Sequence, residues 1–307
     1  MPPRFARRCL VFSLLLLIPA ISDSQSVAGS KFTVTSGTSK ISLRVGRSSP
    51  LDLEISGGLT GLPPGSVRYL TRQDLLELPQ VNFTVTDDPN FDSRAKIRGV
   101  ELQVLAKELA TDGDSALVVA VCDDLYRAYY PQAYIQAHVP VLAVEINGQA
   151  PSSWPKNKEG SGADMGPYLI THSHFTPSFK ILAHEDEAQI PWGVVRLEFQ
   201  NEKVAFDAIA PRGAQAGDPA VQAGFHIAQQ NCVRCHGPES KERQKGILSW
   251  SGIALFAAQA PQDFSAYARN PQARSPSAQM PGNPGYDDAT LQALVSYFQT
   301  FAAQEKR

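Results

Sequence analysis

A five-residue motif near the C-terminus sets the strongest limit on how this chain folds. Cys232 and Cys235 are separated by two residues, and His236 follows directly. Two thiols at the end of one helical turn can bond to both vinyl groups along one porphyrin edge, and the next residue reaches the iron. A C-x-x-C pair alone also suits a redox dithiol or half a zinc site, and the adjoining histidine selects haem. We therefore predict one covalent haem c, attached at Cys232 and Cys235, with His236 as iron ligand.

A sixth iron ligand is expected opposite His236. Methionine in that position raises the iron potential into a range useful for accepting electrons. Of the three methionines in the chain, Met280 alone follows the motif. It lies among prolines and a glycine in residues 279–284, outside any apolar stripe, so core packing explains it poorly. Met280 is the predicted sixth ligand, and the competing candidate, His226, is expected on the surface.

The N-terminus has the pattern of a secretory signal. Three arginines precede an apolar run over residues 9–21, and small residues follow it. The run is shorter than the ~20 apolar residues of a spanning helix, so we expect no stable membrane span after its removal. The prediction is a signal peptide over residues 1–22 and a periplasmic location.

Charge and composition divide the remaining chain. Removing the signal takes away three of 28 basic residues and none of the 30 acidic ones, which leaves a net charge of −5 and argues against a nucleic-acid partner. Residues 219–307 carry +2, with 8 basic and 6 acidic residues. A Pro/Gly/Ala stretch separates them from the acidic part. We predict an N-terminal extension over 23–58, a domain over 59–207, a linker over 208–218 and a domain over 219–307.

The segment over 59–207 has a mixed α/β pattern. Thr71 and Asp74 have the spacing of a capping box for a short helix that Pro79 ends. A second helix is expected over residues 102–109. Strands are expected where β-branched and aliphatic residues cluster, at residues 83–86, 116–122, 139–146 and 194–199. Alternation in the last strand places Val195, Leu197 and Phe199 on one face, and Arg196 and Glu198 on the other.

The segment over 219–307 predicts helices around the haem motif. Its first helix has apolar positions at Val221, Gly224, Phe225 and Ala228. Asp287 or Asp288 caps a last helix whose apolar positions follow the i, i+3, i+4, i+7 rule, at Leu291, Leu294, Val295 and Phe298. Gly224 is expected to let the last helix approach closely near Tyr297.

The order of these features resembles a known family. From residue 221 to residue 301, Gly224, the haem motif, Met280-Pro281 and the aromatic terminal helix follow the order of class I cytochromes c. The resemblance implies an all-α domain, His/Met-ligated iron, and one-electron transfer through an exposed haem edge. Its partner would be another redox protein, a dehydrogenase or a second cytochrome.

The middle segment looks like the sulfite-oxidase-type molybdopterin-binding fold. Short motifs at residues 72–79, 97–102, 139–148 and 166–170 carry that likeness through their order. Active members bind molybdenum through one cysteine thiolate and hold the pterin phosphate with Arg and His. Cys122 ends a strand at the matching place, but Asp123 and Asp124 follow it, and two carboxylates repel an anionic pterin. We expect Cys122 to be a core residue and molybdopterin not to bind.

Three other groups in the middle segment have two interpretations each. His172, His174, His184 and Asp186 suit a divalent metal, although polar loop residues explain them more simply. An aromatic and charged cluster favours a protein interface over a small-molecule pocket; its members are Asp123, Asp124, Tyr126, Arg127, Tyr129 and Tyr130. Trp154 and Trp192 are expected in the core or at its rim.

Together these features predict a multidomain protein, in which a mixed α/β (α+β) sulfite-oxidase-like domain precedes an all-α cytochrome c domain. Its expected role is that of an exported monohaem electron carrier whose N-terminal domain is a docking or ligand-binding module. The sequence predicts no catalytic residue. One alternative is a molybdenum-dependent oxidoreductase that passes substrate electrons to its own haem, and another is a sensor that uses the haem as a redox gauge.

Overall fold

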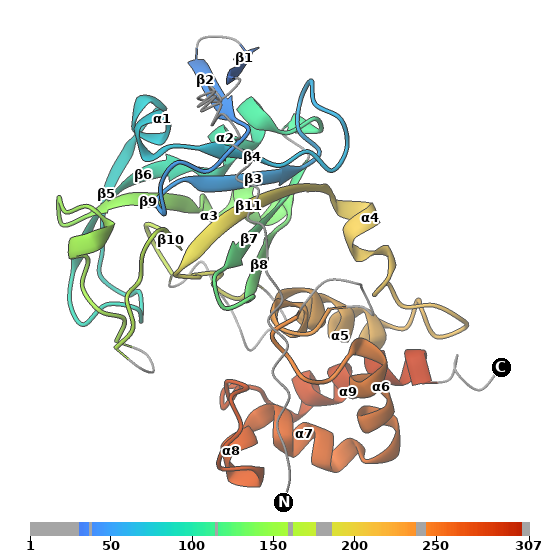
Figure 1. The fold of residues 1–307 in the computed structure, drawn as a ribbon. Helices are drawn as coiled ribbons and strands as arrows, with labels where there is room; N and C mark the ends of the chain where they lie inside the picture. Colours follow the sequence, from blue (N-terminus) through green and yellow to red (C-terminus); the bar gives the residue numbers. More distant parts are fainter. Residues whose placement is uncertain are drawn as a thin grey trace, which may run out of the picture.

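The computed structural model describes residues 31–36, 39–113, 116–158, 162–175, 186–237 and 244–302. Two β-sheets with short helices form the N-terminal part, and helices form the C-terminal part (Figure 1). The predicted signal peptide lies outside the described residues. Within the described part of the chain, no helix is both long and apolar enough to cross a bilayer.

The larger sheet has seven strands in the order β1-β2-β4-β3-β11-β7-β8. Strand β11 lies near its middle, parallel to β3 and antiparallel to β7. The bounds are β1 Lys31–Ser36, β2 Ser39–Arg44, β3 Leu53–Gly57, β4 Arg68–Leu70, β7 Ala116–Cys122, β8 Arg127–Tyr130 and β11 Val194–Asn201. Strands β1 to β3 come from the segment expected as an N-terminal extension, so the sheet continues before residue 59.

The smaller sheet has four antiparallel strands in the order β10-β9-β6-β5. They are β5 Val81–Val85, β6 Ala95–Glu101, β9 Val141–Ile146 and β10 Leu169–Thr171. The described residues of this part also form short helices: α1 Arg72–Glu77, α2 Leu102–Leu109, α3 Gln132–His138, the 3-10 helix η2 Pro151–Ser153 and α4 Glu202–Asp207. The result is the mixed α/β fold class that the sequence predicts.

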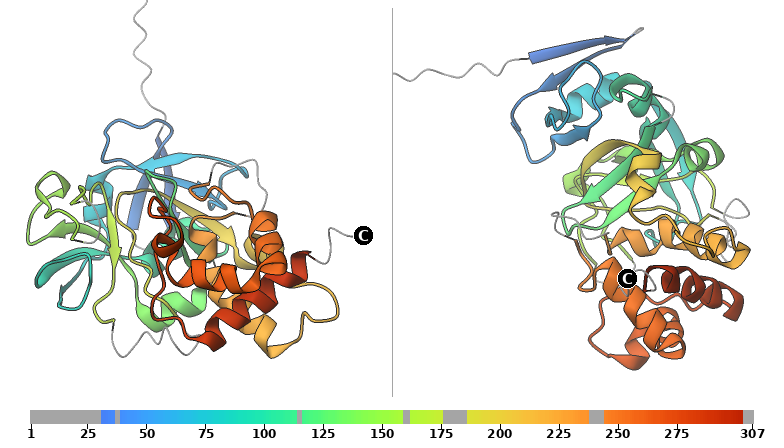
Figure 2. Two further views of the ribbon diagram at one scale, coloured as in Figure 1. Left: turned by 90° about the horizontal axis from the view of Figure 1, so that it is seen from below. Right: turned by 90° about the vertical axis from the view of Figure 1, so that its right-hand side faces the viewer.

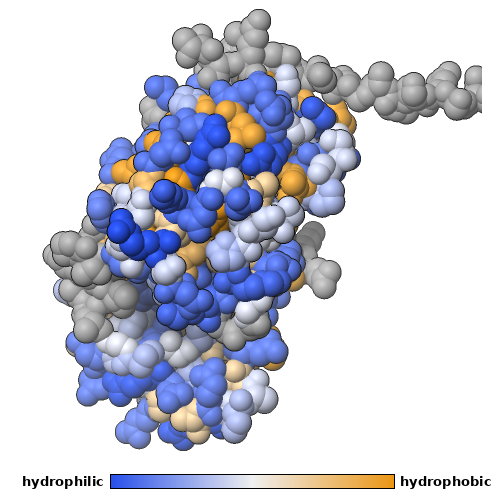
Figure 3. All heavy atoms as spheres, turned by 90° about the vertical axis from the view of Figure 1, so that its left-hand side faces the viewer, coloured by the Kyte–Doolittle hydropathy of each residue, from blue (hydrophilic) through white to orange (hydrophobic). Residues whose placement is uncertain are grey.

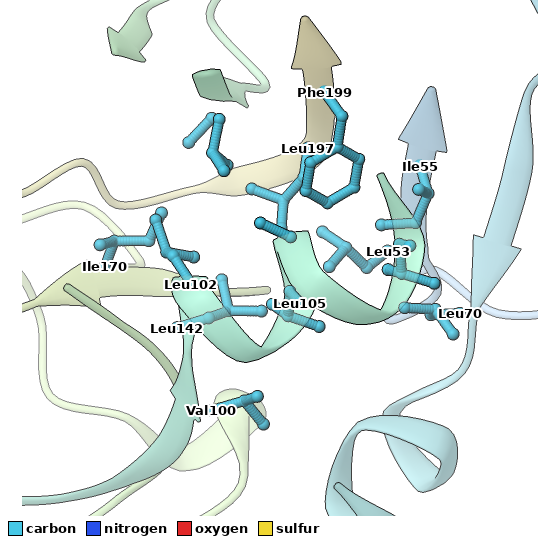
Figure 4. Close-up of a cluster of buried hydrophobic side chains, with 14 of the residues drawn as sticks. Leu53, Ile55, Leu70, Val100, Leu102, Leu105, Leu142, Ile170, Leu197 and Phe199 are labelled. Atoms are coloured by element: carbon cyan, nitrogen blue, oxygen red, sulfur yellow. The ribbon is translucent and has the colours of Figure 1, made fainter. Parts of the chain in front are cut away.

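The first hydrophobic core, core 1, lies between the two sheets and around α2. Figure 4 shows two leucines of α2 among side chains from both sheets; the labelled residues include Leu102, Leu105, Leu142, Leu197 and Phe199. Each of these is 0–1% exposed. The predicted helix over 102–109 is therefore confirmed, and its apolar face is what joins the sheets.

Two strand predictions need correction. The predicted strand at residue 139 starts at Val141, because Val139 has a positive φ of 46° as the C-cap of α3. In β11 a bulge lies between Val194 and Arg196. The bulge inserts one extra residue and shifts the alternation. Val194, not Val195, therefore shares the buried face with Leu197 and Phe199.

The helix predicted after Thr71 is confirmed as α1. The Thr71 hydroxyl accepts a hydrogen bond from the Asp74 backbone N–H at 3.2 Å, and the Asp74 carboxylate accepts one from the Thr71 backbone N–H at 2.9 Å. This reciprocal pair satisfies two backbone donors that the first helical turn leaves without partners. The chain then turns at Leu78 into the loop that leads to β5.

The described residues of the C-terminal part form helices joined by loops and contain no strand. It contains α5 Pro219–Gln230, the 3-10 helix η4 Cys232–Arg234, α6 Trp250–Gln259, α7 Pro261–Arg269, α8 Pro271–Arg274 and α9 Asp288–Ala302. Asp287 caps α9 by accepting a hydrogen bond from the Thr290 backbone N–H at 2.7 Å. The four predicted apolar positions of α9 are all buried.

Helices α5 and α9 approach each other most closely at Gly224. A Cβ atom added there would lie 2.0 Å from the Ala293 carbonyl oxygen and 2.7 Å from the Tyr297 Cβ. Any side chain at Gly224 would therefore separate the two helices. The predicted close approach near Tyr297 is confirmed.

A second core, core 2, joins the two parts of the chain. Strand β7 places Val118 and Ala120 in core 1, while its alternate residues Leu117, Val119 and Val121 belong to core 2 together with side chains of the C-terminal helices. All seven residues of β7 are buried. Figure 2 shows the helices α5 to α9 packed against one side of the sheet-containing part. The helical part thus covers the second face of β7.

One outer face of the molecule is mainly hydrophilic. Figure 3 shows hydrophobic residues there in small groups separated by hydrophilic ones. Small exposed apolar groups are normal on soluble proteins. The apolar surface that this chain must bury is therefore taken up mainly by cores 1 and 2 and by a smaller third core around Trp154 and Met165. Trp192 packs at the rim of the third core, so both tryptophans lie where the sequence predicts.

Candidate haem site

The haem motif lies in one tight turn after α5. Asn231 caps α5, and the 3-10 turn η4 follows directly. The backbone N–H groups of Cys235 and His236 both donate to the Cys232 carbonyl oxygen, at 3.3 and 2.9 Å. This turn brings both thiols and the imidazole to one end of the helix, as covalent attachment of one porphyrin edge requires.

Both motif cysteines are protonated thiols at neutral pH. Burial, followed by the Glu187 carboxylate, raises the pKa of Cys232 to about 12. Burial also raises the pKa of Cys235. Burial thus favours the neutral form of both thiols.

A backbone carbonyl fixes the orientation of His236. Its Nδ1 lies 2.7 Å from the carbonyl oxygen of Leu248. A carbonyl oxygen only accepts, so Nδ1 carries the proton and donates it. Nε2 then keeps its lone pair, which is the form of imidazole that binds a metal. The donor set of the motif therefore fits haem iron.

Gly246 allows this hydrogen bond to form. A Cβ added at Gly246 would lie 2.4 Å from the His236 Nδ1 and 3.0 Å from the Cys235 carbonyl oxygen. The Gly246 backbone N–H donates to that same oxygen at 2.7 Å. Neither Gly246 nor Leu248 was predicted from the sequence. The feature of the sequence that pointed to this contact was a glycine ten positions after the motif histidine.

Met280 lies on the loop between α8 and α9 and belongs to neither core. Its side chain is half-buried, and the Gln272 side chain donates to the Met280 carbonyl oxygen at 2.9 Å. Asn283 ties the far end of the loop to α7: its backbone N–H donates to the Arg269 carbonyl oxygen at 3.0 Å. The loop is thus held on both sides of Met280, and ligation by its sulfur stays a prediction.

His226 is half-exposed near the start of the last turn of α5. Its Nε2 lies 2.7 Å from the Gln230 amide nitrogen and 3.8 Å from the Asp186 carboxylate. The ring is therefore engaged with neighbours on the side of α5 that meets residues 186–189. The predicted surface position of His226 is thus confirmed.

A charged residue inside the motif is buried against the N-terminal part. The Arg234 side chain is 15% exposed, and its Nη2 lies 3.7 Å from the Glu187 carboxylate. Glu187 accepts hydrogen bonds from the Tyr286 hydroxyl at 2.6 Å and from the Asn231 side chain at 2.5 Å. Its backbone N–H donates to the Gln230 side chain at 2.5 Å. Glu187, in the segment that leads into β11, therefore contacts residues at both ends of the haem-binding region, Asn231 and Tyr286.

The predicted aromatic and charged cluster divides between this contact and the core. Asp124 forms an ion pair with Lys245, whose ammonium lies 5.5 Å from the Tyr126 ring centroid. Tyr129 packs against core 2 and against the ring of Phe206, 5.8 Å away. These residues make contacts between the two parts of the chain, and their predicted role in binding a partner protein stays a prediction. The fully buried Tyr130 belongs instead to core 1, and Arg127 pairs with Glu198 at 2.9 Å.

Cys122 is a core residue. It is 4% exposed and belongs to core 1. Burial, followed by the carboxylates of Asp124 and Asp123, raises its pKa well above the ordinary thiol value. The predicted core position of Cys122 is thus confirmed, and the expectation that molybdopterin does not bind stays a prediction.

The histidines of the candidate metal group lie in loops where the structure describes them, as the simpler interpretation predicts. His172 directly follows β10 and is nevertheless fully buried; its Nε2 lies 3.1 Å from the Tyr134 hydroxyl. Burial, followed by His138, lowers its pKa to about 3. His174 is exposed, and His184 lies outside the described residues. Asp186 pairs with the buried His138 at 2.7 Å. Across the described ranges, no three metal-binding side chains come together.

Comparison with known proteins identifies the helical part. Residues 221–302 match the family model described as cytochrome c. The C-terminal part is therefore a cytochrome c domain, which implies covalently bound haem c, electron transfer and a redox partner. No curated protein matches the chain.

One solved structure with a similar chain is the sulfane dehydrogenase SoxCD from Paracoccus pantotrophus, with 15% sequence identity and a TM-score of 0.34. The similarity covers 55% of this chain and 45% of that one. This chain thus spans less than half of the length of that relative. A likeness of this size does not assign the N-terminal part to a family.

Proposed function

We propose that this chain is an exported electron carrier with one haem, bonded through Cys232 and Cys235 and ligated by His236 and Met280. The observation that carries the proposal is the hydrogen bond from His236 Nδ1 to Leu248. It leaves Nε2 as a metal ligand directly after two thiols in one turn. Haem bound there supplies a one-electron couple. The chain's own residues attach it, orient the imidazole and cover one side of the motif with the N-terminal part.

The N-terminal part would act as a docking module. Its aromatic and charged residues already contact the cytochrome c domain through Tyr126, Asp124 and Glu187. We propose that this part also holds the haem domain in a fixed orientation toward a partner dehydrogenase or cytochrome. The signal-like N-terminus supports a periplasmic location for both proteins. The sulfite-oxidase-like assignment of residues 59–207 belongs to this proposal and rests on the order of the short motifs.

The absorption spectrum of oxidised protein tests the ligand assignment, because charge transfer from a methionine sulfur requires ferric iron. Protein from a host competent in haem maturation is expected to show a low-spin haem with the band of methionine ligation. Met280→Ala should abolish that band and keep the covalently bound haem. His226→Ala is the matched control and should leave the spectrum unchanged. A Met280→Ala spectrum equal to wild type would refute the assignment.

The alternative function is a molybdenum-dependent oxidoreductase. Metal analysis separates the two functions, because the carrier holds iron without molybdenum when matured with both available. Cys122→Ser separates them again: electron uptake should be unaffected in a carrier and abolished in an enzyme. A sensor would show redox-dependent partner binding without net electron flux.

A further inference from the structure

We propose that the N-terminal part tunes the haem reduction potential through Glu187, which opposes the buried charge of Arg234 inside the haem motif. The inference rests on the proposed haem at Cys232 and Cys235. It assigns Arg234 and Glu187 as residues that set the potential of that group without ligating it.

Arg234 places a permanent positive charge beside the porphyrin attachment point. It lies between Cys232 and Cys235, directly next to the latter in the chain, and a guanidinium stays protonated at any pH where the protein is folded. Its side chain is 15% exposed. A charge in such a position is screened weakly by solvent and needs a partner.

Glu187 is the carboxylate that meets this charge, and it is equally buried. Its side chain is also 15% exposed, and its Oε2 lies 3.7 Å from the Arg234 Nη2. The other oxygen, Oε1, accepts hydrogen bonds from Asn231 and Tyr286. Asn231 directly precedes the haem motif, and Tyr286 follows the Met280 loop. The carboxylate is therefore held in place by residues that flank both predicted ligand segments.

The two charges act on the haem couple with opposite signs. Reduction removes one positive charge from the iron, so a nearby cation favours the ferrous state and a nearby anion favours the ferric state. A unit charge about 10 Å away, at an effective dielectric constant of about 20, changes such an equilibrium roughly tenfold. For a one-electron couple a tenfold change corresponds to about 59 mV. Arg234 is thus expected to raise the potential and Glu187 to lower it.

Glu187 belongs to the segment that leads into β11, so the tuning charge comes from outside the cytochrome c domain. The same segment is anchored to the N-terminal part: the Gln189 backbone N–H donates to the buried Tyr134 hydroxyl at 2.8 Å. Loss of the contact between the two parts would remove the carboxylate from Arg234. The reduction potential of the haem would then rise. The contact between the N-terminal part and the cytochrome c domain is thereby coupled to the redox state of the haem.

The test is a potentiometric titration of three full-length variants. Glu187→Gln should raise the reduction potential, so that the ratio of ferrous to ferric haem at a fixed applied potential rises about tenfold. Arg234→Gln should lower that ratio by a similar factor. Arg234→Lys keeps the charge and should move the potential less than Arg234→Gln. If the pair had only a structural role, Glu187→Gln and Arg234→Gln would shift the reduction potential in the same direction.

Asp124→Asn is the matched control. It removes another carboxylate that pairs across the same contact, but its side chain is 46% exposed. Solvent screens such a charge, so its shift should be much smaller than that of Glu187→Gln. The proposal is overturned if Glu187→Gln shifts the reduction potential no more than Asp124→Asn does. This comparison can be made even when the Arg234→Gln protein fails to acquire haem. The haem spectrum reports separately on the proposed function: absent haem refutes both ideas, whereas normal haem with an unmoved potential refutes only this one.

Discussion

The two parts of this molecule encode their roles in different ways. In the cytochrome c domain, five consecutive residues define the chemistry, and the helices on either side of the motif bury their apolar faces as their spacing predicts. In the N-terminal part, the seven-stranded sheet pairs β11 with β3, whose residues lie about 140 positions earlier. A local motif can therefore be identified from the sequence. The function of a sheet made of distant strands cannot be predicted from any one segment of the chain.

The largest expected effect separates the two parts by their cysteines. Replacing Cys232 and Cys235 together by Ala should abolish covalent haem, because no thioether bond can form. Cys122→Ala should leave the haem content unchanged, because that thiol is a buried core group. Haem staining of denatured protein measures both. Equal staining of the double variant and wild type would contradict the assignment of the motif.

Gly224→Val tests the helix contact that closes the haem domain. The new side chain would meet the Ala293 carbonyl oxygen, which lies 2.0 Å from the position of an added Cβ. We expect a loss of about 3 kcal/mol in unfolding free energy, in the range of overpacked cores. Gly217→Ala is the control, since nothing lies within 4 Å of its added Cβ. Denaturant unfolding followed by haem absorbance should separate the two variants, and equal midpoints would contradict the close packing.

A smaller effect, confined to the N-terminal part, is expected from pH. The pKa of His172 is lowered by burial to about 3 from an unfolded value of 6.5. Between these values the unfolded state binds a proton that the folded state excludes, so stability falls as the pH falls below 6.5. From pH 6.5 to pH 5 the loss is about 1.5 kcal/mol, at up to about 1.4 kcal/mol per pH unit.

His172→Gln should remove this pH-dependent loss, and the exposed His174→Gln should keep it. Unfolding measured by tryptophan fluorescence at pH 6.5 and pH 5 checks both, since Trp154 and Trp192 lie in the N-terminal part. A loss of the same size in both variants would show that His172 is not the group responsible.

The smallest effect concerns the ion pair between the two parts. Lys245 and Asp124 are 36% and 46% exposed, and pairs at that exposure contribute about 0–1 kcal/mol. Lys245→Ala should therefore lower the unfolding free energy by less than about 1 kcal/mol, and high salt should reduce the difference further. A loss of several kcal/mol in chemical denaturation would show that this pair, and not core 2, holds the parts together.

Local patterns predicted much of what the structure shows. The capping box at Thr71 and the helix over 102–109 depend on residues near one another in sequence. The haem motif belongs to the same class. The close approach at Gly224 joins residues about 70 positions apart, and it was predicted from the order of features in the cytochrome c resemblance. The bulge at Val194 and the burial of His172 were missed, because both depend on neighbours that only the folded sheets provide.

One signal for the contact between the parts was present in the sequence. All seven residues over 116–122 are apolar or small, which a strand with one solvated face would not require. The run indicates a strand covered on both faces, and the second cover proves to be the cytochrome c domain. The partner of Arg234 had no such signal, because Glu187 is distant in sequence and its pairing depends on how the two parts pack.

The most direct test of covalent attachment is the mass of the peptide that contains residues 232–236 after cleavage at glutamate, which leaves the motif whole between Glu202 and Glu239. The protein is matured with haem and extracted with acid acetone before the digestion. The account predicts one haem retained on that peptide through its two sulfur atoms, with iron released or kept. An unmodified peptide with both thiols free to react with iodoacetamide would contradict covalent attachment, and with it the electron-carrier function.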